Sequence, residues 1–221
     1  RDRRPCWPSC LGAGDGLVHP ARPEDPALVT FTSGSSGTPK GANRTHGFLR
    51  AQHAALRTEF SARSGDVDMT MFPVFALNNI ALGVPTVIPD LDFRRVAAAD
   101  AARLRAQMER HAVTSCTASP PFFDRLAALD RRPPLRRILT GGAPVSDRQL
   151  ETWCAAWPGA EILVAYGSTE AEPVAHIAAP ELGGEGMLAL GQLAVGRVKA
   201  PQLHDLFADP ALGVDGPILV K

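Results

Sequence analysis

The sequence predicts an α/β fold with a largely parallel sheet and helices on both faces. Short apolar runs rich in β-branched residues alternate along the chain with longer segments whose apolar residues recur at helical spacing. This alternation favours parallel strands joined by crossover helices. Glycine-containing loops follow three of the expected strands, after Phe31, Leu139 and Tyr166. Because ligands bind at the carboxyl ends of strands in such sheets, we expect these loops to share one edge and one ligand.

The expected elements follow in order from local sequence signals. A strand at residues 28–31 is followed by a loop and then a helix for which Thr45 is a suitable N-cap. Leu56 and Phe60 fall on one face of that helix, and Gly65 is suited to end it. The later elements are strands at 68–73 and 85–89, a helix at 98–112, a strand at 113–118, a helix from Ser119, a strand at 137–140, a helix from Ser146 and a strand at 161–166.

The helix after Ser146 has the clearest pattern. Ser146 and Gln149 have the spacing of a capping box, in which each residue bonds to the backbone of the other. Its apolar face is formed by Leu150, Trp153, Cys154 and Trp157. The pattern therefore predicts that Cys154 is buried, as we also expect for Cys116 in the strand at 113–118.

Composition and charge restrict the function classes. The 221 residues are 45% hydrophobic and 21% charged, which is ordinary for a globular protein. The 23 basic and 23 acidic residues balance, so no global field favours nucleic acid or an anionic membrane. No apolar run approaches the roughly 18 to 20 residues that span a bilayer, and no secretory signal begins the chain, which favours a cytoplasmic protein.

Three regions are expected along the chain. Residues 1–26 are rich in Pro, Gly and Arg and are interpreted as an irregular leader. Residues 27–185 form the α/β core. Residues 186–221 are turn-rich and are expected to form short antiparallel strands of a β segment that is truncated.

The loop after the first strand has the composition of an anion site. Residues 32–41 read TSGSSGTPKG, with three glycines, five hydroxyl residues and one lysine. Glycine lets backbone N–H groups approach a phosphate, hydroxyl groups add donors and lysine adds positive charge. The P-loop pattern G-x-x-x-x-G-K-[ST] fails, because Pro39 and Gly41 stand where it requires Gly and Ser or Thr. The residues assigned to this phosphate cradle are Thr32, Ser33, Gly34, Ser35, Ser36, Gly37, Thr38 and Lys40.

Three motifs in order resemble the AMP-forming adenylating superfamily of acyl-CoA synthetases, luciferases and peptide-synthetase adenylation domains. They are the signature loop at residues 31–41 with Thr45-His46 after it, Gly-Gly-Ala-Pro at 141–144 and Tyr-Gly-Ser-Thr-Glu at 166–170. The resemblance implies that the core is nucleotide-binding and is part of the large N-terminal domain of an adenylating enzyme. It also implies that a carboxylate attacks the α-phosphate of ATP, with Mg²⁺ bound, to give acyl-AMP and pyrophosphate.

The resemblance assigns roles to individual residues. It implies that Tyr166 stacks on adenine, that Thr169 bonds the α-phosphate and that Glu170 ligates Mg²⁺. An oxygen ligand on a carboxylate suits this hard cation. The residues that it places against the nucleotide are Gly141, Gly142, Ala143, Pro144, Tyr166, Gly167, Ser168 and Thr169. The catalytic candidates are Lys40, Thr169 and Glu170.

The resemblance also indicates where the acyl substrate binds. Acyl-CoA synthetases carry a Pro-x-aromatic-His segment along the acyl pocket, and Phe75 matches its aromatic residue, whereas Ala76 stands where the His is expected. Phe75, Ala76 and His46 are the substrate-binding candidates. Together with residues 87–94 and 166–173, this segment resembles olefin β-lactone synthetases. Those enzymes adenylate a long-chain 3-hydroxy fatty acid whose hydroxyl then closes a β-lactone.

Two parts of the superfamily are absent from the sequence. The Thr-Gly-Asp whose aspartate binds ribose has no counterpart after residue 170, and no C-terminal domain with its catalytic lysine follows. We therefore expect a partial chain that is completed by that domain. The alternatives left open are a fatty acyl-CoA synthetase, an inactive nucleotide-binding fragment and a P-loop phosphohydrolase, the last disfavoured by Pro39 and Gly41. The expected partners are a small-molecule carboxylate and other hydrocarbon-pathway enzymes.

Overall fold

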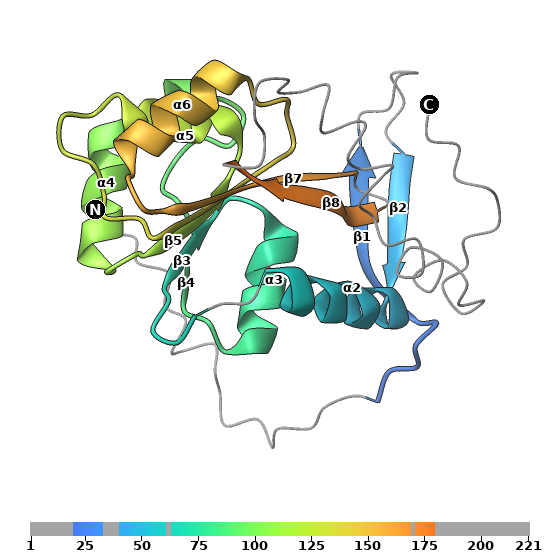
Figure 1. Cartoon of the computed structure of the whole chain (residues 1–221). Coiled ribbons are helices and arrows are strands. Elements are labelled where there is room, and N and C mark those ends of the chain that lie inside the picture. Colours follow the sequence, from blue (N-terminus) through green and yellow to red (C-terminus); the bar gives the residue numbers. More distant parts are fainter. Residues whose placement is uncertain (1–19, 33–39, 61–62, 169–170, 180–221) are drawn as a thin grey trace.

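A six-stranded sheet is the centre of the molecule. The computed structural model describes residues 20–32, 40–60, 63–168 and 171–179. In spatial order the strands are β4 (Thr86–Val87), β3 (Asp68–Thr70), β5 (Ser115–Ala118), β6 (Arg137–Thr140), β7 (Glu161–Ser168) and β8 (Ala171–Ala178) (Figure 1). The pairs from β4 to β7 are parallel, and β8 pairs antiparallel with β7. The predicted largely parallel sheet is confirmed.

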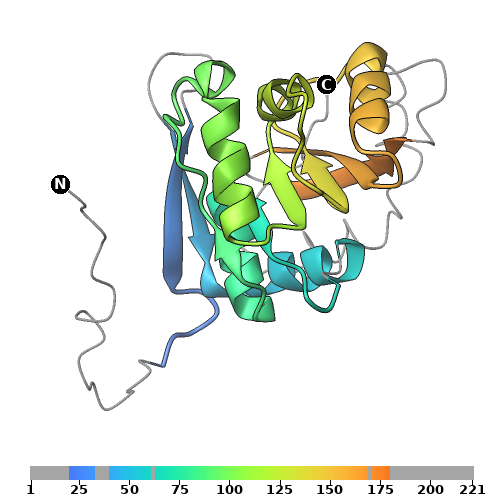
Figure 2. The same cartoon turned by 90° about the vertical axis from the view of Figure 1, so that its left-hand side faces the viewer.

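Helices cover both faces of this sheet, as predicted. They are α2 (His46–Glu59), α3 (Pro73–Leu82), α4 (Ala101–Arg110), α5 (Pro120–Ala127) and α6 (Asp147–Ala156), with a short 3₁₀ helix η1 (Val96–Ala98). Successive residues of a strand point to opposite faces. Accordingly Ile138 joins the core under α4, α5 and α6, whereas Leu139 joins a smaller core with Leu56 of α2. Figure 2 shows α6 above the sheet and α2 below it.

The larger core lies between the sheet and helices α4 to α6. Phe122, Phe123 and Trp153 are fully buried there, and the rings of Phe123 and Trp153 are 5.7 Å apart at their centroids. The Trp153 indole N–H donates to the Asp124 carboxylate at 3.0 Å, which links α6 to α5. Aromatic burial on this scale is the main stabilising term for such a layer.

The predicted helix starts at Thr45 and Ser146 are confirmed. The Thr45 hydroxyl accepts a hydrogen bond from the Phe48 N–H at 3.1 Å. At α6 both bonds of the capping box form: the Gln149 N–H donates to the Ser146 hydroxyl, and the Ser146 N–H donates to the Gln149 side-chain carbonyl. Local sequence spacing therefore sets both starts.

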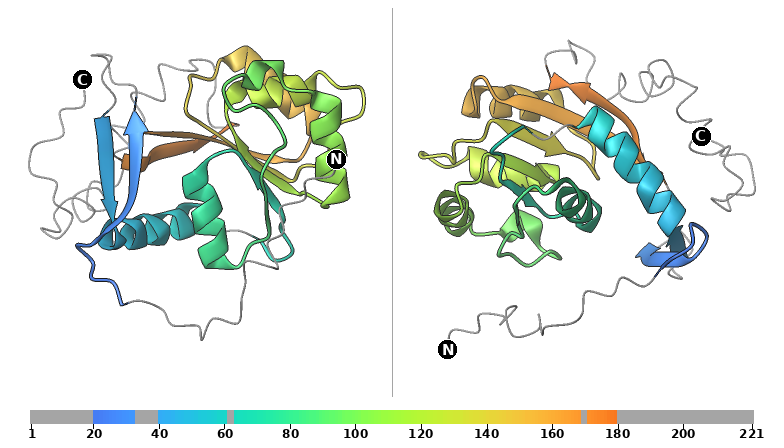
Figure 3. Two further views of the ribbon diagram at one scale, coloured as in Figure 1. Left: turned by 180° about the vertical axis from the view of Figure 1, so that it is seen from behind. Right: turned by 90° about the horizontal axis from the view of Figure 1, so that it is seen from below.

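The first expected strand belongs to a separate sheet. β1 (Pro26–Thr32) pairs antiparallel with β2 (Lys40–Thr45), and helix α2 contacts both this hairpin and β8 (Figure 3). The expectation that the loop after β1 follows a strand of the parallel sheet is therefore wrong. β2 reads KGANRT, which has neither alternation nor strong β propensity, so its strand forms through the ladder with β1 rather than from a local signal.

Two other expectations are corrected. Gly65 does not end α2, because the helix stops at Glu59 with Phe60 as its C-cap, and Gly65 has φ +79° in the turn before β3. Cys154 is exposed, whereas Cys116 is buried as expected. Trp153 and Trp157 take the inward positions of α6, and the residue after Trp153 is rotated by about 100° away from them.

Besides β2 and η1, helix α3 and strand β8 also had no counterpart in the prediction. Residues 73–82 form α3, with Pro73 at its first turn and Gly83 closing it at φ +70°. Strand β8 forms the antiparallel edge of the sheet next to β7. The turn-rich segment after residue 185 and the leader at 1–19 lie outside the described residues.

Candidate functional site

A pocket of about 60 Å³ lies at the carboxyl ends of the central strands. Gly141 and Gly142, which follow β6, form part of its wall, and Tyr166 and Gly167 at the end of β7 form another part. Two of the three loops expected to share a ligand therefore border the same pocket. The third loop, residues 33–39, lies outside the described residues.

Glycine is required where these two walls meet. A Cβ atom added to Gly141 would lie 2.8 Å from the carbonyl oxygen of Ala165, closer than a carbon and an oxygen normally approach. Gly142 has φ +78°, a conformation that side-chain-bearing residues rarely adopt, and faces the ring of Phe72. The backbones of the β6 and β7 ends approach closely because neither glycine carries a side chain.

The opposite wall is apolar and comes largely from α3 and the residues before it. Phe75 is half-buried, and its ring lies 6.2 Å from that of Phe72 and 6.4 Å from that of Phe60, measured between centroids. The apolar side chains along the pocket are those of Phe72, Val74, Phe75, Leu139 and Ala165. Such a wall favours the hydrocarbon or ring portion of a ligand over its charged portion.

Several pocket residues were missed by the sequence argument. Phe72, Val74, Thr117, Leu139, Thr140 and Ala165 line the pocket without belonging to any of the motifs. For the residues on β5, β6 and β7 a signal was present, because each stands at or near the carboxyl end of a predicted strand. Phe72 also stood near the carboxyl end of the strand predicted at 68–73, whereas Val74 reaches the pocket from α3, a helix that had not been assigned.

Other predicted residues lie elsewhere. Ala143 and Pro144 are exposed and do not line the pocket. Ala76 is half-buried on α3 but is not among the lining residues. Of the two positions that match the aromatic-His pair, only Phe75 lines the pocket. His46 is the exposed first residue of α2, where its N–H donates to the Asp25 carbonyl at 3.1 Å.

The remaining candidates cannot be placed in the pocket from the described side chains. Thr32 and Lys40 pair at the end of the β1–β2 hairpin that adjoins residues 33–39, with only their backbones described. The backbone of Ser168 ends β7. Residues 33–39, Thr169 and Glu170 fall outside the described ranges.

A test of fit separates the nucleotide from the metal. The pocket is bordered by Gly141, Gly142 and Gly167 and by Tyr166, which is 52% exposed, and glycine backbone beside an aromatic residue suits a flat aromatic base. Among the described residues no group of three His, Cys, Asp or Glu side chains is arranged to hold a metal ion, and the predicted ligand Glu170 is not among them.

None of the helices in the described ranges is both long and apolar enough to cross a membrane.

Comparison with known proteins adds the family context. The model of the AMP-binding enzyme family matches residues 8–198. The chain is 40% identical over 174 residues to the olefin beta-lactone synthetase of Stenotrophomonas maltophilia, covering 78% of this chain and 30% of that protein. It is 30% identical over 165 residues to 4-coumarate–CoA ligase 1 of Oryza sativa, covering 69% of this chain and 29% of the ligase.

The fold matches solved structures of related architecture. The o-succinylbenzoate coenzyme A synthetase of Bacillus subtilis in complex with AMP superposes with a TM-score of 0.63 at 21% identity, covering 76% of this chain and 35% of that one. The same enzyme solved with ATP and magnesium gives a TM-score of 0.62 at 22% identity. At such identities the likeness shows the fold alone. The chain spans about a third of the length of each of these three relatives.

Proposed function

We propose, since the chain belongs to the AMP-binding enzyme family, that it forms part of an ATP-dependent enzyme that activates a long-chain 3-hydroxy fatty acid as acyl-AMP. Pyrophosphate leaves in this step, and a β-lactone follows. The observation that carries the proposal is the pocket shared by the glycine loop after β6 and the end of strand β7 at Tyr166 and Gly167. The 40% identity to an olefin beta-lactone synthetase supports the choice of acid.

The nucleotide side of the site is assigned to the two loops. The Gly141-Gly142 backbone would contact one face of an adenine ring, and Tyr166, which borders the same pocket, would stack on it. Stacking of a base on an aromatic side chain contributes about 1–3 kcal/mol in other nucleotide complexes. Because the pocket is small, it would hold the base or the reacting end of the acid rather than a whole ligand.

The phosphates are assigned to residues 32–40 and to the loop after β7. Lys40 would supply positive charge, and the hydroxyl groups and N–H groups of the cradle would supply donors. Thr169 would bond the α-phosphate and Glu170 would hold Mg²⁺. When bound, Mg²⁺ offsets negative charge on the pyrophosphate leaving group.

The apolar wall is assigned to the acyl chain. Val74 and Phe75 of α3 face the pocket together with Leu139 and Ala165 of the sheet, so the carbons next to the carboxylate would lie between a helix and a strand end. Phe75 is the one member of the substrate-binding candidates that borders the pocket.

The reaction needs no covalent bond to the protein. A carboxylate oxygen attacks the α-phosphorus of ATP, the bond from that phosphorus to the bridging oxygen breaks, and pyrophosphate leaves. The 3-hydroxyl of the acid then attacks the acyl carbon, AMP departs and the hydroxyl proton passes to solvent, which leaves a β-lactone. Catalysis is then mainly positioning and charge stabilisation, to which a single well-placed donor contributes about 10²–10³ in rate.

Exchange of labelled pyrophosphate into ATP tests the proposal. The longer protein of which this chain is proposed to form part, with Mg²⁺ and a long-chain 2-alkyl-3-hydroxy acid, is expected to catalyse exchange only when the acid is present, and Lys40→Ala is expected to reduce it at least a hundredfold. Release of phosphate would point to a phosphohydrolase. Nucleotide binding without exchange would identify a non-catalytic nucleotide-binding fragment. Either result contradicts the proposed activity.

A fatty acyl-CoA synthetase is the second candidate, supported by the 30% identity to a 4-coumarate–CoA ligase. The two candidates share the first half-reaction and differ in what attacks the acyl adenylate. Mass spectrometry of the products separates them, because a β-lactone forms without coenzyme A, whereas a thioester requires it.

A further inference from the structure

The pocket depends on two elements that do not meet at its surface. Helix α3 carries Val74 and Phe75 of the apolar wall, and strand β5 carries Thr117, which lines the pocket from the sheet. A ligand between them contacts both, so the spacing of α3 from β5 decides which acyl group fits. The side chain that links these two elements lies below the pocket, on β3.

That side chain is Asp68. It is 3% exposed and accepts hydrogen bonds from the Asn79 side-chain amide at 2.9 Å, from the Ser115 hydroxyl at 2.8 Å and from the Thr117 hydroxyl at 3.3 Å. Asn79 belongs to α3, whereas Ser115 and Thr117 belong to β5. One carboxylate therefore bonds the helix on one side and the pocket-lining strand residue on the other.

The position of Asn79 makes this link effective. Asn79 follows Phe75 by four residues, one turn of α3, so the two side chains lie on the same side of the helix. Fixing the Asn79 amide on Asp68 thereby constrains the height and rotation of the turn of α3 that carries Phe75. Thr117 is held from the other side, because its hydroxyl donates to the same carboxylate.

A carboxylate is an unusual choice for this place if stability alone is considered. Burying a charged group costs free energy even when its hydrogen bonds are formed, and an apolar side chain of similar volume often serves equally well. An apolar residue, however, forms no directional hydrogen bonds. The bonds of a carboxylate can specify one arrangement of α3 and β5.

From these contacts we propose that Asp68 is a positioning residue of the site, which sets the acyl side of the pocket by joining α3 to Thr117. The proposal rests on the function proposed above, in which α3 contacts the acyl chain. The nucleotide side depends on β6 and β7, whose Gly141, Gly142 and Tyr166 have no hydrogen bond to Asp68 among the contacts described. A change at Asp68 is therefore expected to alter acid binding more than nucleotide binding.

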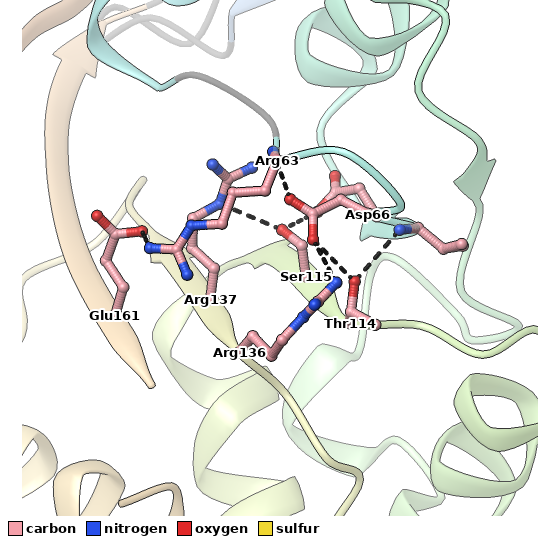
Figure 4. A network of polar contacts seen from close by, with 9 residues as sticks. Arg63, Asp66, Thr114, Ser115, Arg136, Arg137 and Glu161 are labelled. Carbon is pink, nitrogen blue, oxygen red and sulfur yellow. Dashed lines mark hydrogen bonds and ion pairs between the residues drawn. The ribbon is translucent and has the colours of Figure 1, made fainter. Parts of the chain in front are cut away.

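The chain offers a matched control two residues earlier. Asp66 is 5% exposed and accepts hydrogen bonds from the Arg63 N–H at 2.7 Å, the Thr114 hydroxyl at 3.0 Å and the Arg136 guanidinium at 3.0 Å (Figure 4). It precedes the amino end of β3, and neither it nor its partners line the pocket. Asp66→Asn therefore disturbs a buried carboxylate of similar connectivity without touching α3.

The experiment compares Asp68→Asn, Asn79→Ala and Asp66→Asn in the 221-residue chain. Urea unfolding first establishes conditions in which every variant is folded, and calorimetry then measures binding of AMP and of a long-chain 3-hydroxy acid. Asp68→Asn and Asn79→Ala are expected to weaken acid binding at least tenfold while AMP binding changes less than threefold. Asp66→Asn is expected to leave both affinities within twofold of those of the unmodified chain.

Three results would overturn the proposal: unchanged acid affinity in Asp68→Asn and Asn79→Ala, an equal loss of both ligands, or the same loss in Asp66→Asn. Amide hydrogen exchange provides a readout that needs no ligand. Exchange at residues 74–79 is expected to rise at least tenfold in Asp68→Asn and not in Asp66→Asn. If the unmodified chain binds neither ligand, the proposed function fails, and the exchange result still decides whether Asp68 positions α3.

Discussion

Gly141 shows how one residue controls the approach of two strand ends. The clash that a Cβ atom would make is with a backbone oxygen, which has no rotamer with which to move away. Its importance was predictable only as part of a Gly-Gly-Ala-Pro motif, because the contact with Ala165 joins residues 24 positions apart. The burial of Cys116 followed from its strand, but the exposure of Cys154 did not follow from its spacing, since two tryptophans occupy the inward face of α6.

Gly141→Ala is expected to lower the free energy of unfolding by about 1–3 kcal/mol, as overpacking typically does, and to weaken AMP binding by separating the two loops. Urea denaturation and calorimetry measure the two effects. Gly47→Ala is the control, because its added Cβ atom would lie 3.1 Å from the Pro23 carbonyl oxygen, away from the pocket residues. Unchanged nucleotide affinity in Gly141→Ala would count against a base at this wall.

The pH dependence of stability is expected to reveal Asp68. Burial raises the pKa of its carboxyl above the ordinary value of 3.8, against the opposing effects of its hydrogen bonds and of the Arg137 charge. The folded state then binds the proton more tightly than the unfolded chain, so the stabilisation from protonation is complete below pH 3.8 and is lost as pH rises through the folded pKa. Relative to that of Asp68→Asn, the unfolding free energy of the unmodified chain is expected to rise as pH falls from above the folded pKa of Asp68 to 3.8. A difference in unfolding free energy that does not vary with pH would contradict this.

Whole elements differ in how far local sequence determines them. Helix α6 was predictable from its capping box and apolar spacing, because both signals lie within one segment. Strand β2 was not, since it takes its conformation from the ladder with β1, and α3 was not assigned, although Pro73 and Gly83 bound it. The pocket uses α3, so the apolar wall is the part of the site that sequence reasoning described least well.

The caps of α5 and α6 provide a test at this scale. Ser146→Ala removes a hydroxyl that accepts from the Gln149 N–H and is expected to cost about 0.5–2 kcal/mol of unfolding free energy. Ser119 occupies the corresponding N-cap of α5 but makes no side-chain cap bond. The loss of unfolding free energy in Ser119→Ala is therefore expected to be only a few tenths of the loss in Ser146→Ala. Equal losses in the two variants, measured by urea denaturation, would contradict the role given to the capping box.

For the molecule as a whole, the alternation of strands and helices was sufficient to predict the layered sheet. It was not sufficient to predict which strands share that sheet, because β1 pairs with β2 in a separate hairpin, and α2 contacts both that hairpin and β8. The consequence for function is that the glycine loop after β6 and the end of β7 at Tyr166 are joined by the main sheet. The segment proposed to bind the phosphates connects β1 and β2, which form a separate two-stranded sheet.

The central claim is that the ends of β6 and β7 grip one nucleotide, and its most direct test is an AMP titration followed by the backbone amide resonances of the ¹⁵N-labelled chain. We predict saturable shifts at Gly141, Gly142, Tyr166 and Gly167, all with the same dissociation constant. Shifts confined to α4 and η1 on the other side of the molecule, or none at these four amides at saturating AMP, would contradict the account.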